Sequence, residues 1–163
     1  RREHVLRELD KPAIIPHVAE SQGLKFPYEA LFRSLHKLLV DTATSEYLFC
    51  CDFWGADGAV FDDLIEPVLS LIKDKLEEDV GDLYDPVAIL LMIRINHGHQ
   101  VIMQRRRAPC LDAYLDGVNL LLWPKFKTLF DQQMSSLRAA GPKGGLFEGT
   151  KPSPVSQRFS DFL

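Results

Sequence analysis

The sequence predicts an all-α protein built as an elongated bundle of helices. Apolar residues recur at steps of three and four along most of the 163-residue chain, which is the spacing of one helix face. Sustained alternation of apolar and polar residues, which would indicate a strand, appears nowhere. Prolines and glycines separate the periodic segments at places that suit the beginnings and ends of helices.

Residues 28–54 carry the clearest helical pattern, and the other segments are expected to pack against this helix. Its apolar stripe consists of Tyr28, Leu31, Phe32, Leu35, Leu38, Leu39, Thr42, Leu48 and Phe49. Charged residues fall largely between these positions, namely Arg33, Lys37, Asp41 and Glu46. We therefore expect the leucine stripe to be packed and the charged face to be wet. The run Thr42-Ala-Thr-Ser is expected to bend or break the helix before Glu46.

The rest of the chain divides into segments within one predicted domain. Residues 1–27 form a connecting segment that opens with the last turns of a helix, in which Val5, Leu6 and Leu9 share one side. A helical core spans residues 28–140. The glycine- and proline-rich segment 141–154 reads as a flexible loop. Residues 155–163 read as a helix that the end of the chain truncates, so both ends look cut from a longer protein.

Three further helices are expected inside the core. Gly55 and Gly58 end the preceding helix, and Asp57 is a plausible cap for the first of these three, which Gly81 closes. Pro67 is expected to kink it or mark a restart. Asp85-Pro86 is a strong start signal for the second, which ends at Arg105-Arg106-Arg107. Its first half is apolar nearly all round, so we expect it at the centre of the bundle. Pro109 opens the third, which Pro124 should kink.

Composition excludes several classes of protein. Charged residues make up 26% and hydrophobic residues 46% of the chain, and the net charge of −4 gives no reason to expect nucleic-acid binding. Three cysteines in this arrangement predict neither a disulfide framework nor a zinc site, which favours a reducing compartment. No apolar run reaches membrane-spanning length.

No motif predicts a catalytic, metal or cofactor site. The segment GGLFEGTK (144–151) lacks the order of a phosphate-binding loop. His97 and His99 are two residues apart and would point to different faces of a helix, and the Cys50-Cys51 pair shares that defect. The acidic cluster of Glu77, Glu78, Asp79 and Asp82 lacks the alternation of a calcium loop and reads as a solvated face.

Candidate partner-binding residues lie at two predicted helix ends. Phe53 and Trp54 precede a glycine turn; burial in the core is the simpler interpretation, and exposure would make either an interface anchor. Arg105 and Arg106 are candidate steering charges. Favourable placement at a helix C-terminus explains the arginines with fewer assumptions, and contact with phosphate, anionic lipid or an acidic partner stays open.

Several motifs together resemble a known family. These are YEALFRSLHKLL (28–39), TSEYLFCCDFW (44–54), YDPVAILLMIRI (84–95) and LDAYLDGVNLLLWPKF (111–126). In order and spacing, from about Pro27 to the end, the chain resembles the Vps fifty-two (Sac-two) family of the GARP and EARP vesicle-tethering complexes. The resemblance implies a helical rod of the CATCHR type, belonging to the C-terminal region of such a subunit.

The resemblance also implies a function. It implies non-enzymatic capture of endosome-derived vesicles in retrograde transport, on the cytosolic face of the trans-Golgi network and endosomes, with peripheral membrane association only. The implied partners are sibling GARP or EARP subunits, SNAREs and a Golgi Rab GTPase of the Rab-six type. Two binding hypotheses stay open: recognition of a GTP-loaded Rab, or a scaffold surface along Leu111 to Leu137 for sibling subunits or SNARE helices. A metal-dependent hydrolase using His97 and His99 is disfavoured by their spacing.

Overall fold

A computed structural model describes residues 2, 4–55, 59–139 and 160 of the chain. Its elements are α1 (His4–Arg7), α2 (Pro16–Ser21), α3 (Tyr28–Trp54), α4 (Ala59–Gly81), α5 (Pro86–Arg106), the 3-10 turn η1 (Pro109–Leu111) and α6 (Asp112–Ala139). No strand occurs within the described ranges, which confirms the all-α prediction. None of the helices found there is long and apolar enough to cross a bilayer.

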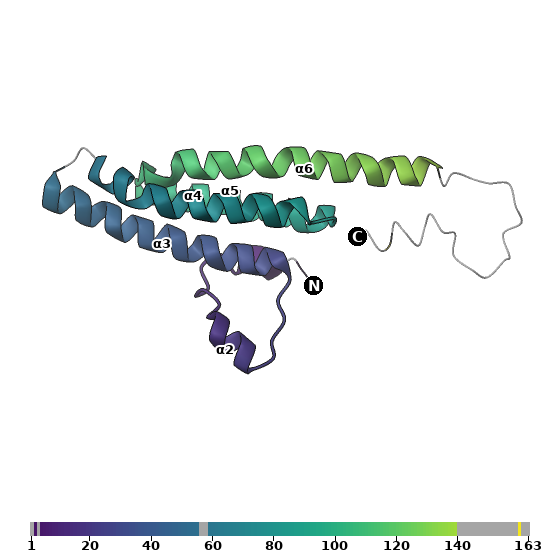
Figure 1. The fold of residues 1–163 in the computed structure, drawn as a ribbon, viewed down its shortest axis with the longest axis horizontal. Helices are drawn as coiled ribbons and strands as arrows, with labels where there is room; N and C mark the ends of the chain where they lie inside the picture. The colour runs from purple at the N-terminus through teal and green to yellow at the C-terminus, as the bar shows by residue number, and fades with distance from the viewer. Residues whose placement is uncertain (1, 3, 56–58, 140–159, 161–163) are drawn as a thin grey trace, which may run out of the picture.

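The long helices α3 to α6 form an elongated bundle in which consecutive helices run in opposite directions (Figure 1). α3 packs against α4 and α5, and α6 packs against the same two helices. The Tyr28 hydroxyl at the start of α3 donates to Asp79 near the end of α4, at 2.8 Å. The side-chain amide of Asn96 on α5 donates to the Leu115 carbonyl on α6, also at 2.8 Å. The second half of α6 extends beyond its neighbours (Figure 1).

Helix α5 packs against α1, α3 and α6 and buries ten of its 21 residues, in line with its apolar sequence. It begins where the sequence indicates, because the Asp85 carboxylate accepts hydrogen bonds from the backbone amides of Val87 and Ala88 at 2.9 and 3.4 Å. Pro86 occupies the first turn. At the other end, Arg107 adopts a left-handed conformation with φ 56° and closes the helix.

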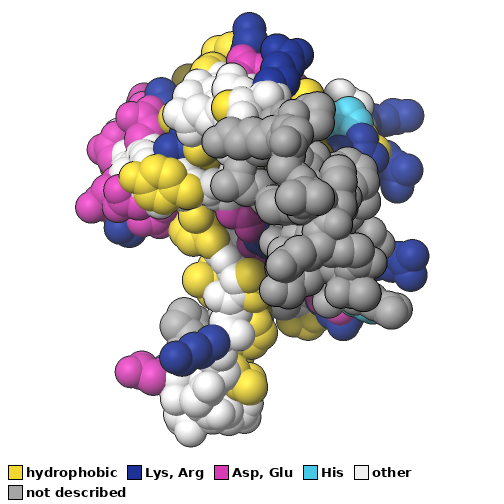
Figure 2. Space-filling model, turned by 90° about the vertical axis from the view of Figure 1, so that its right-hand side faces the viewer, with side chains coloured by type: hydrophobic (Ala, Val, Ile, Leu, Met, Phe, Trp, Pro, Cys, Tyr) yellow, Lys and Arg dark blue, Asp and Glu magenta, His cyan; other side chains and the backbone are white. Residues whose placement is uncertain are grey.

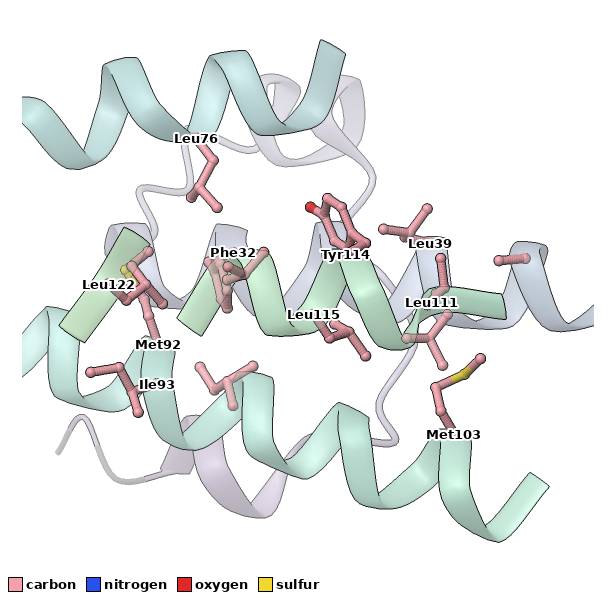
Figure 3. Packing of buried hydrophobic residues seen from close by; sticks show 14 of the residues in the cluster. Phe32, Leu39, Leu76, Met92, Ile93, Met103, Leu111, Tyr114, Leu115 and Leu122 are labelled. Atoms are coloured by element: carbon pink, nitrogen blue, oxygen red, sulfur yellow. The ribbon is translucent and has the colours of Figure 1, made fainter. Parts of the chain in front are cut away.

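The core contains side chains from all four long helices. Figure 3 shows Phe32 and Leu39 of α3, Leu76 of α4, Met92 and Met103 of α5, and Leu115 and Leu122 of α6 directed toward one another. These side chains are buried, and they belong to one continuous hydrophobic cluster. Burying such side chains is worth roughly 1.5–3 kcal/mol each, so this contact surface stabilises the bundle.

The prediction of which face of α3 is packed is partly wrong. Phe32 and Leu39 are buried, but Leu31, Leu35 and Leu38 are 45%, 44% and 56% exposed. The buried face also carries polar residues, which are Glu29, Arg33, Ser34 and His36. A hydrophobic pattern alone selects the leucine stripe, because those polar side chains make the true core face look wet.

Hydrogen-bond partners from other elements explain why these polar side chains are buried. Glu29 accepts from the Arg2 guanidinium at 2.7 Å. Arg33 donates to the backbone carbonyls of Glu8 and Lys11 at 3.1 and 2.8 Å. The segment before α3 therefore covers part of the helix that the sequence predicts to be exposed.

Helix α3 is continuous, so the predicted bend or break at Thr42-Ala-Thr-Ser does not interrupt it. The Thr44 hydroxyl donates back to the Val40 carbonyl at 2.6 Å, which satisfies it within the helix. Pro67 and Pro124 likewise lie inside the unbroken helices α4 and α6. Gly55, with φ 96°, ends α3 as predicted, because this backbone conformation suits glycine.

The described residues before α3, which are residue 2 and residues 4–27, lie beside α3, and we call them the arm. Val5 of α1 is buried, and Leu6 and Leu9 pack against the core, as their spacing predicts. Helix α2 was not predicted, and it projects from the side of α3 (Figure 1). The predicted cap Asp57, the predicted loop 141–154 and the predicted helix 155–163, apart from Ser160, lie outside the described residues.

Candidate protein-interaction surface

An aromatic cluster, formed by Phe49, Phe53 and Trp54, is exposed at the C-terminal end of α3. Phe53 is 69% exposed and Trp54 is 53% exposed, so the simpler expectation of core burial is wrong for both. The rings touch one another: Phe49 stacks on Phe53 at 5.7 Å, and Trp54 meets Phe53 edge-on at 4.9 Å. Exposed aromatic clusters of this kind mark protein interfaces, because rigid aromatic side chains dominate binding energy there.

The cluster is exposed because of its place on α3. Cys50 of the same turns is buried, so the helix still packs through one face near its end. On that side Tyr47 meets Phe61 of α4 edge-on at 5.5 Å. Phe49 and Phe53 are four residues apart and share an exposed side of α3, and the helix ends directly after Trp54.

A groove of about 600 Å³ lies at the other end of α3, between the arm, α3 and α4. We call it the arm groove. Its lining is largely apolar and includes Ile14, Leu24, Phe26, Leu31, Leu35, Leu38, Ile72 and Leu76, with Glu20, Lys75 and Asp79 as charged members. Figure 2 shows hydrophobic side chains running from the body of the molecule down to the arm, with acidic side chains gathered beside them. The exposed leucines of α3 therefore line a groove instead of the core.

The two candidate arginines lie elsewhere on the bundle. Arg106 donates to Asp41 at 2.7 Å and to the Thr44 hydroxyl at 3.0 Å, so it ties the end of α5 to the middle of α3. Burial alone would raise the pKa of Asp41, but Lys37 and Arg106 hold it below its usual range. Arg105 is exposed in the last turn of α5, the favourable position for a cation that the sequence indicates. Trp54 follows Thr44 by ten residues along α3, a rise of about 15 Å, so the structure does not bring the arginines together with Phe53 and Trp54.

The histidines and cysteines occupy the places that their spacing suggests. His97 is exposed and His99 is buried, so they do point to different faces. Cys50 is buried, and Cys51 and Cys110 are half-buried free thiols. Within the described part of the chain, no group of three or more histidine, cysteine or acidic side chains could hold a metal ion. The glycine of His97-Gly98-His99 has a packing role instead, since a Cβ there would lie 2.5 Å from the Leu9 side chain.

Sequence reasoning missed a buried polar cluster around His36. Its Nδ1 lies 2.9 Å from the Phe32 carbonyl, and its Nε2 lies 3.1 Å from the Tyr114 hydroxyl of α6. The ring of His99 of α5 stacks on the ring of His36 at a centroid distance of 6.3 Å. Burial lowers the pKa of His36 to about 3 and that of His99 to about 4. Both rings are therefore neutral at physiological pH and serve as packing groups.

Comparison with known proteins decides the family. The family model described as "Vps52, C-terminal" matches residues 1–163, the whole chain. The chain belongs to the Vps52 family. No solved structure matches it.

Relatives from plants, mammals and yeast support the assignment to the Vps52 family. Vacuolar protein sorting-associated protein 52 A of Arabidopsis thaliana is 49% identical over 158 residues, covering 97% of this chain and 22% of the relative. The Rattus norvegicus homolog is 37% identical over 161 residues, covering 95% of this chain and 22% of the relative. The Saccharomyces cerevisiae protein is 30% identical over 148 residues, covering 86% of this chain and 23% of the relative. This Vps52-family chain thus spans about a fifth of the length of these relatives.

Proposed function

We propose that this Vps52-family chain is part of a non-enzymatic subunit of the GARP and EARP tethering complexes and binds a GTP-loaded Golgi Rab GTPase of the Rab-six type. In this proposal it acts in retrograde transport from endosomes to the trans-Golgi network, on the cytosolic face of those membranes, as a peripheral component. Family membership supports a role in sorting, since the names of the relatives above describe vacuolar protein sorting.

The exposed aromatic cluster of Phe49, Phe53 and Trp54 carries the proposal of Rab binding. A GTPase orders its switch segments only when the γ-phosphate is present, and a partner that packs on them reads the nucleotide state. Such packing needs apolar anchors on the partner, with a polar rim around them. The cluster supplies three touching rings at the end of a long rigid helix. Phe53 and Trp54 are therefore the proposed anchors.

Arg105 and Arg106 are proposed as steering charges at a distance from the anchors. A charge outside the contact changes association rate and salt dependence more than it changes affinity. The guanidinium of Arg106 already serves a structural role at Asp41, so its replacement would also loosen α5 from α3. Arg105 is the cleaner residue with which to test steering.

Binding of the 163-residue chain to a panel of Rab GTPases, each loaded with GTP analogue or GDP, tests this function. We expect one Golgi Rab to bind in its GTP form, and we expect Phe53→Ala with Trp54→Ala to weaken that binding by more than about thirtyfold, as loss of two anchors should. Leu120→Ala is the matched control, because Leu120 is a large apolar side chain that is 77% exposed and belongs to α6, whereas the cluster belongs to α3. Equal binding of the double variant and the control would remove Phe53 and Trp54 from the interface.

A scaffold surface for sibling subunits or SNARE helices is the second candidate function. The apolar residues predicted to form its groove are mostly internal, since Leu111, Tyr114, Leu115, Val118, Leu122 and Leu129 are buried. Exposed apolar side chains do follow the outer side of α6, at Leu120, Trp123 and Phe130. Co-purification with sibling subunits or SNAREs that requires Trp123, without binding of a Rab, would favour this alternative.

A further inference from the structure

The arm groove is a second apolar surface, separate from the aromatic cluster. Its floor includes Leu31, Leu35 and Leu38, which stand at positions i, i+4 and i+7 of α3 and so lie along one line of the helix. That line is about 10 Å long, the length of two helical turns. Half-buried Ile72 and buried Leu76 of α4 form the facing side. A groove of this size and apolar character can take several large side chains.

The rim of the arm groove is negatively charged. Glu20 and Asp79 line the groove together with the cation Lys75. Lys75 is already paired, at 2.9 Å to Glu78 and at 2.9 Å to Asp79, and these two carboxylates raise its pKa. Glu77 lies on the same end of α4 as Glu78 and the half-exposed Asp79, and Asp82 lies just beyond the helix. Two carboxylates and one ammonium group therefore line the groove, and acidic side chains gather beside it (Figure 2).

We propose that the arm groove binds an amphipathic helix of a partner protein, one whose apolar face is flanked by lysine or arginine. The apolar face of that helix would lie along Leu31, Leu35 and Leu38. Its cations would meet Glu20 and Asp79, which line the groove, and Glu78, which lies beside them as a partner of Lys75. This inference does not depend on recognition of a Rab, because the groove and the aromatic cluster lie at opposite ends of α3.

The geometry and the charge favour this occupant over others. A line of apolar side chains with helical spacing matches the anchor pattern of a helix laid into a groove. A strand would need an exposed sheet edge, and the described part of the chain contains no strand. A second copy of this chain would place acidic rim against acidic rim, and an anionic membrane would meet the same repulsion.

Two labelled helical peptides of about 18 residues each test the proposal by fluorescence anisotropy with the 163-residue chain. Both carry leucine at i, i+3, i+4 and i+7; one has lysine beside the leucine face, and the other has glutamate at the same places. We expect the lysine peptide to bind at least about tenfold more tightly than the glutamate peptide, with affinity that falls as salt rises.

Variants of the groove locate the binding. Leu35→Ser with Leu38→Ser should weaken binding of the lysine peptide by at least about tenfold, and Glu20→Gln with Glu78→Gln should reduce its salt dependence. All four side chains are exposed, so the variants should keep the circular dichroism spectrum and urea midpoint of the parent chain. Leu64→Ser is the matched control, because Leu64 is 62% exposed on α4 and does not line the groove, and it should bind within about twofold of the parent chain.

Three results would overturn the proposal. One is equal binding of the two peptides. Another is undiminished binding by the Leu35→Ser, Leu38→Ser variant, which would place the peptide elsewhere. The third is sedimentation that shows a dimer which this variant abolishes, because a second copy would then occupy the groove.

Discussion

Lowering the pH from 7.5 to 5 is expected to cost this protein about 4 kcal/mol of unfolding free energy through two histidines, about 2 kcal/mol each. His36 and His99 are both fully buried, and burial lowers their pKa values to about 3 and about 4. Well above the unfolded pKa of about 6.5, both rings are neutral in the folded and unfolded chains, so their contribution to stability is constant there. As the pH falls through that value, the two histidines bind protons in the unfolded chain but not in the folded chain. The unfolding free energy therefore decreases until the pH reaches the folded pKa values.

Other groups contribute little over the same window. The pKa values of Asp41 and Asp79 are lowered by their lysine and arginine or tyrosine partners, so both carboxylates stay ionised at pH 5. Charges near His99 also act in the expected direction, since Lys37 and Arg33 add to the effect of burial in lowering its pKa. The acid sensitivity between pH 7.5 and 5 should therefore come mainly from the buried rings.

Urea unfolding of the parent chain and of its His99→Leu and His97→Gln variants, at pH 7.5 and at pH 5, measures this effect. His99→Leu should lose about half of the pH dependence, and it should keep its stability at pH 7.5, because neither ring nitrogen of His99 has a hydrogen-bond partner among the described residues. His97→Gln is the control, since His97 is exposed and lies two residues from His99. This variant should keep the full pH dependence of the unfolding free energy. A His99→Leu chain with the pH dependence of the parent would show that His99 titrates normally in the folded state.

Phe32→Ala is expected to destabilise the bundle by about 3–5 kcal/mol, whereas Leu35→Ala should change stability by about 0.5 kcal/mol or less. The two positions lie about one turn apart on α3 and differ in burial. Phe32 is 3% exposed and its ring contacts His36 at a centroid distance of 3.9 Å, so removing it leaves a cavity beside the polar cluster. Leu35 is 44% exposed in the arm groove, where a shorter side chain leaves no enclosed void.

Chemical denaturation of both variants at pH 7.5 gives the comparison directly. A difference in stability between the two variants would not come from helix propensity, because both introduce alanine, the best helix former. Comparable losses at the two positions would mean that the leucine stripe packs in the folded protein, and the arm groove would then be filled. A stable Phe32→Ala chain would contradict the assignment of the core.

The sequence predicted the helices more accurately than the faces that they bury. Asp85-Pro86 identified the start of α5, and its apolar first half identified it as a heavily buried helix, because those signals are local. The packed face of α3 could not be predicted in the same way. Glu29 and Arg33 are buried only because Arg2 and the carbonyls of Glu8 and Lys11 reach them, and such contacts from 22 to 27 residues away leave no mark in the local pattern.

The candidate surface was predicted in part. Residue type and position before a glycine identified Phe53 and Trp54, and their exposure required the structure. The arm groove could not be predicted, because the arm, which includes α2, forms one wall of it, and contacts such as that of Arg33 with the Lys11 carbonyl join positions 22 residues apart. The role of Arg106 was equally hidden, since its partner Asp41 lies 65 residues away.

Hydrogen exchange of the 163-residue chain, alone and with the GTP-loaded Rab that binds it, tests the central claim that α3 presents the recognition surface. We expect slower exchange over Phe49–Trp54 and the first turns of α4, with α5 unchanged because its amides are already protected in the core. Slower exchange confined to α6, or no change on addition of any GTP-loaded Rab, would contradict this assignment.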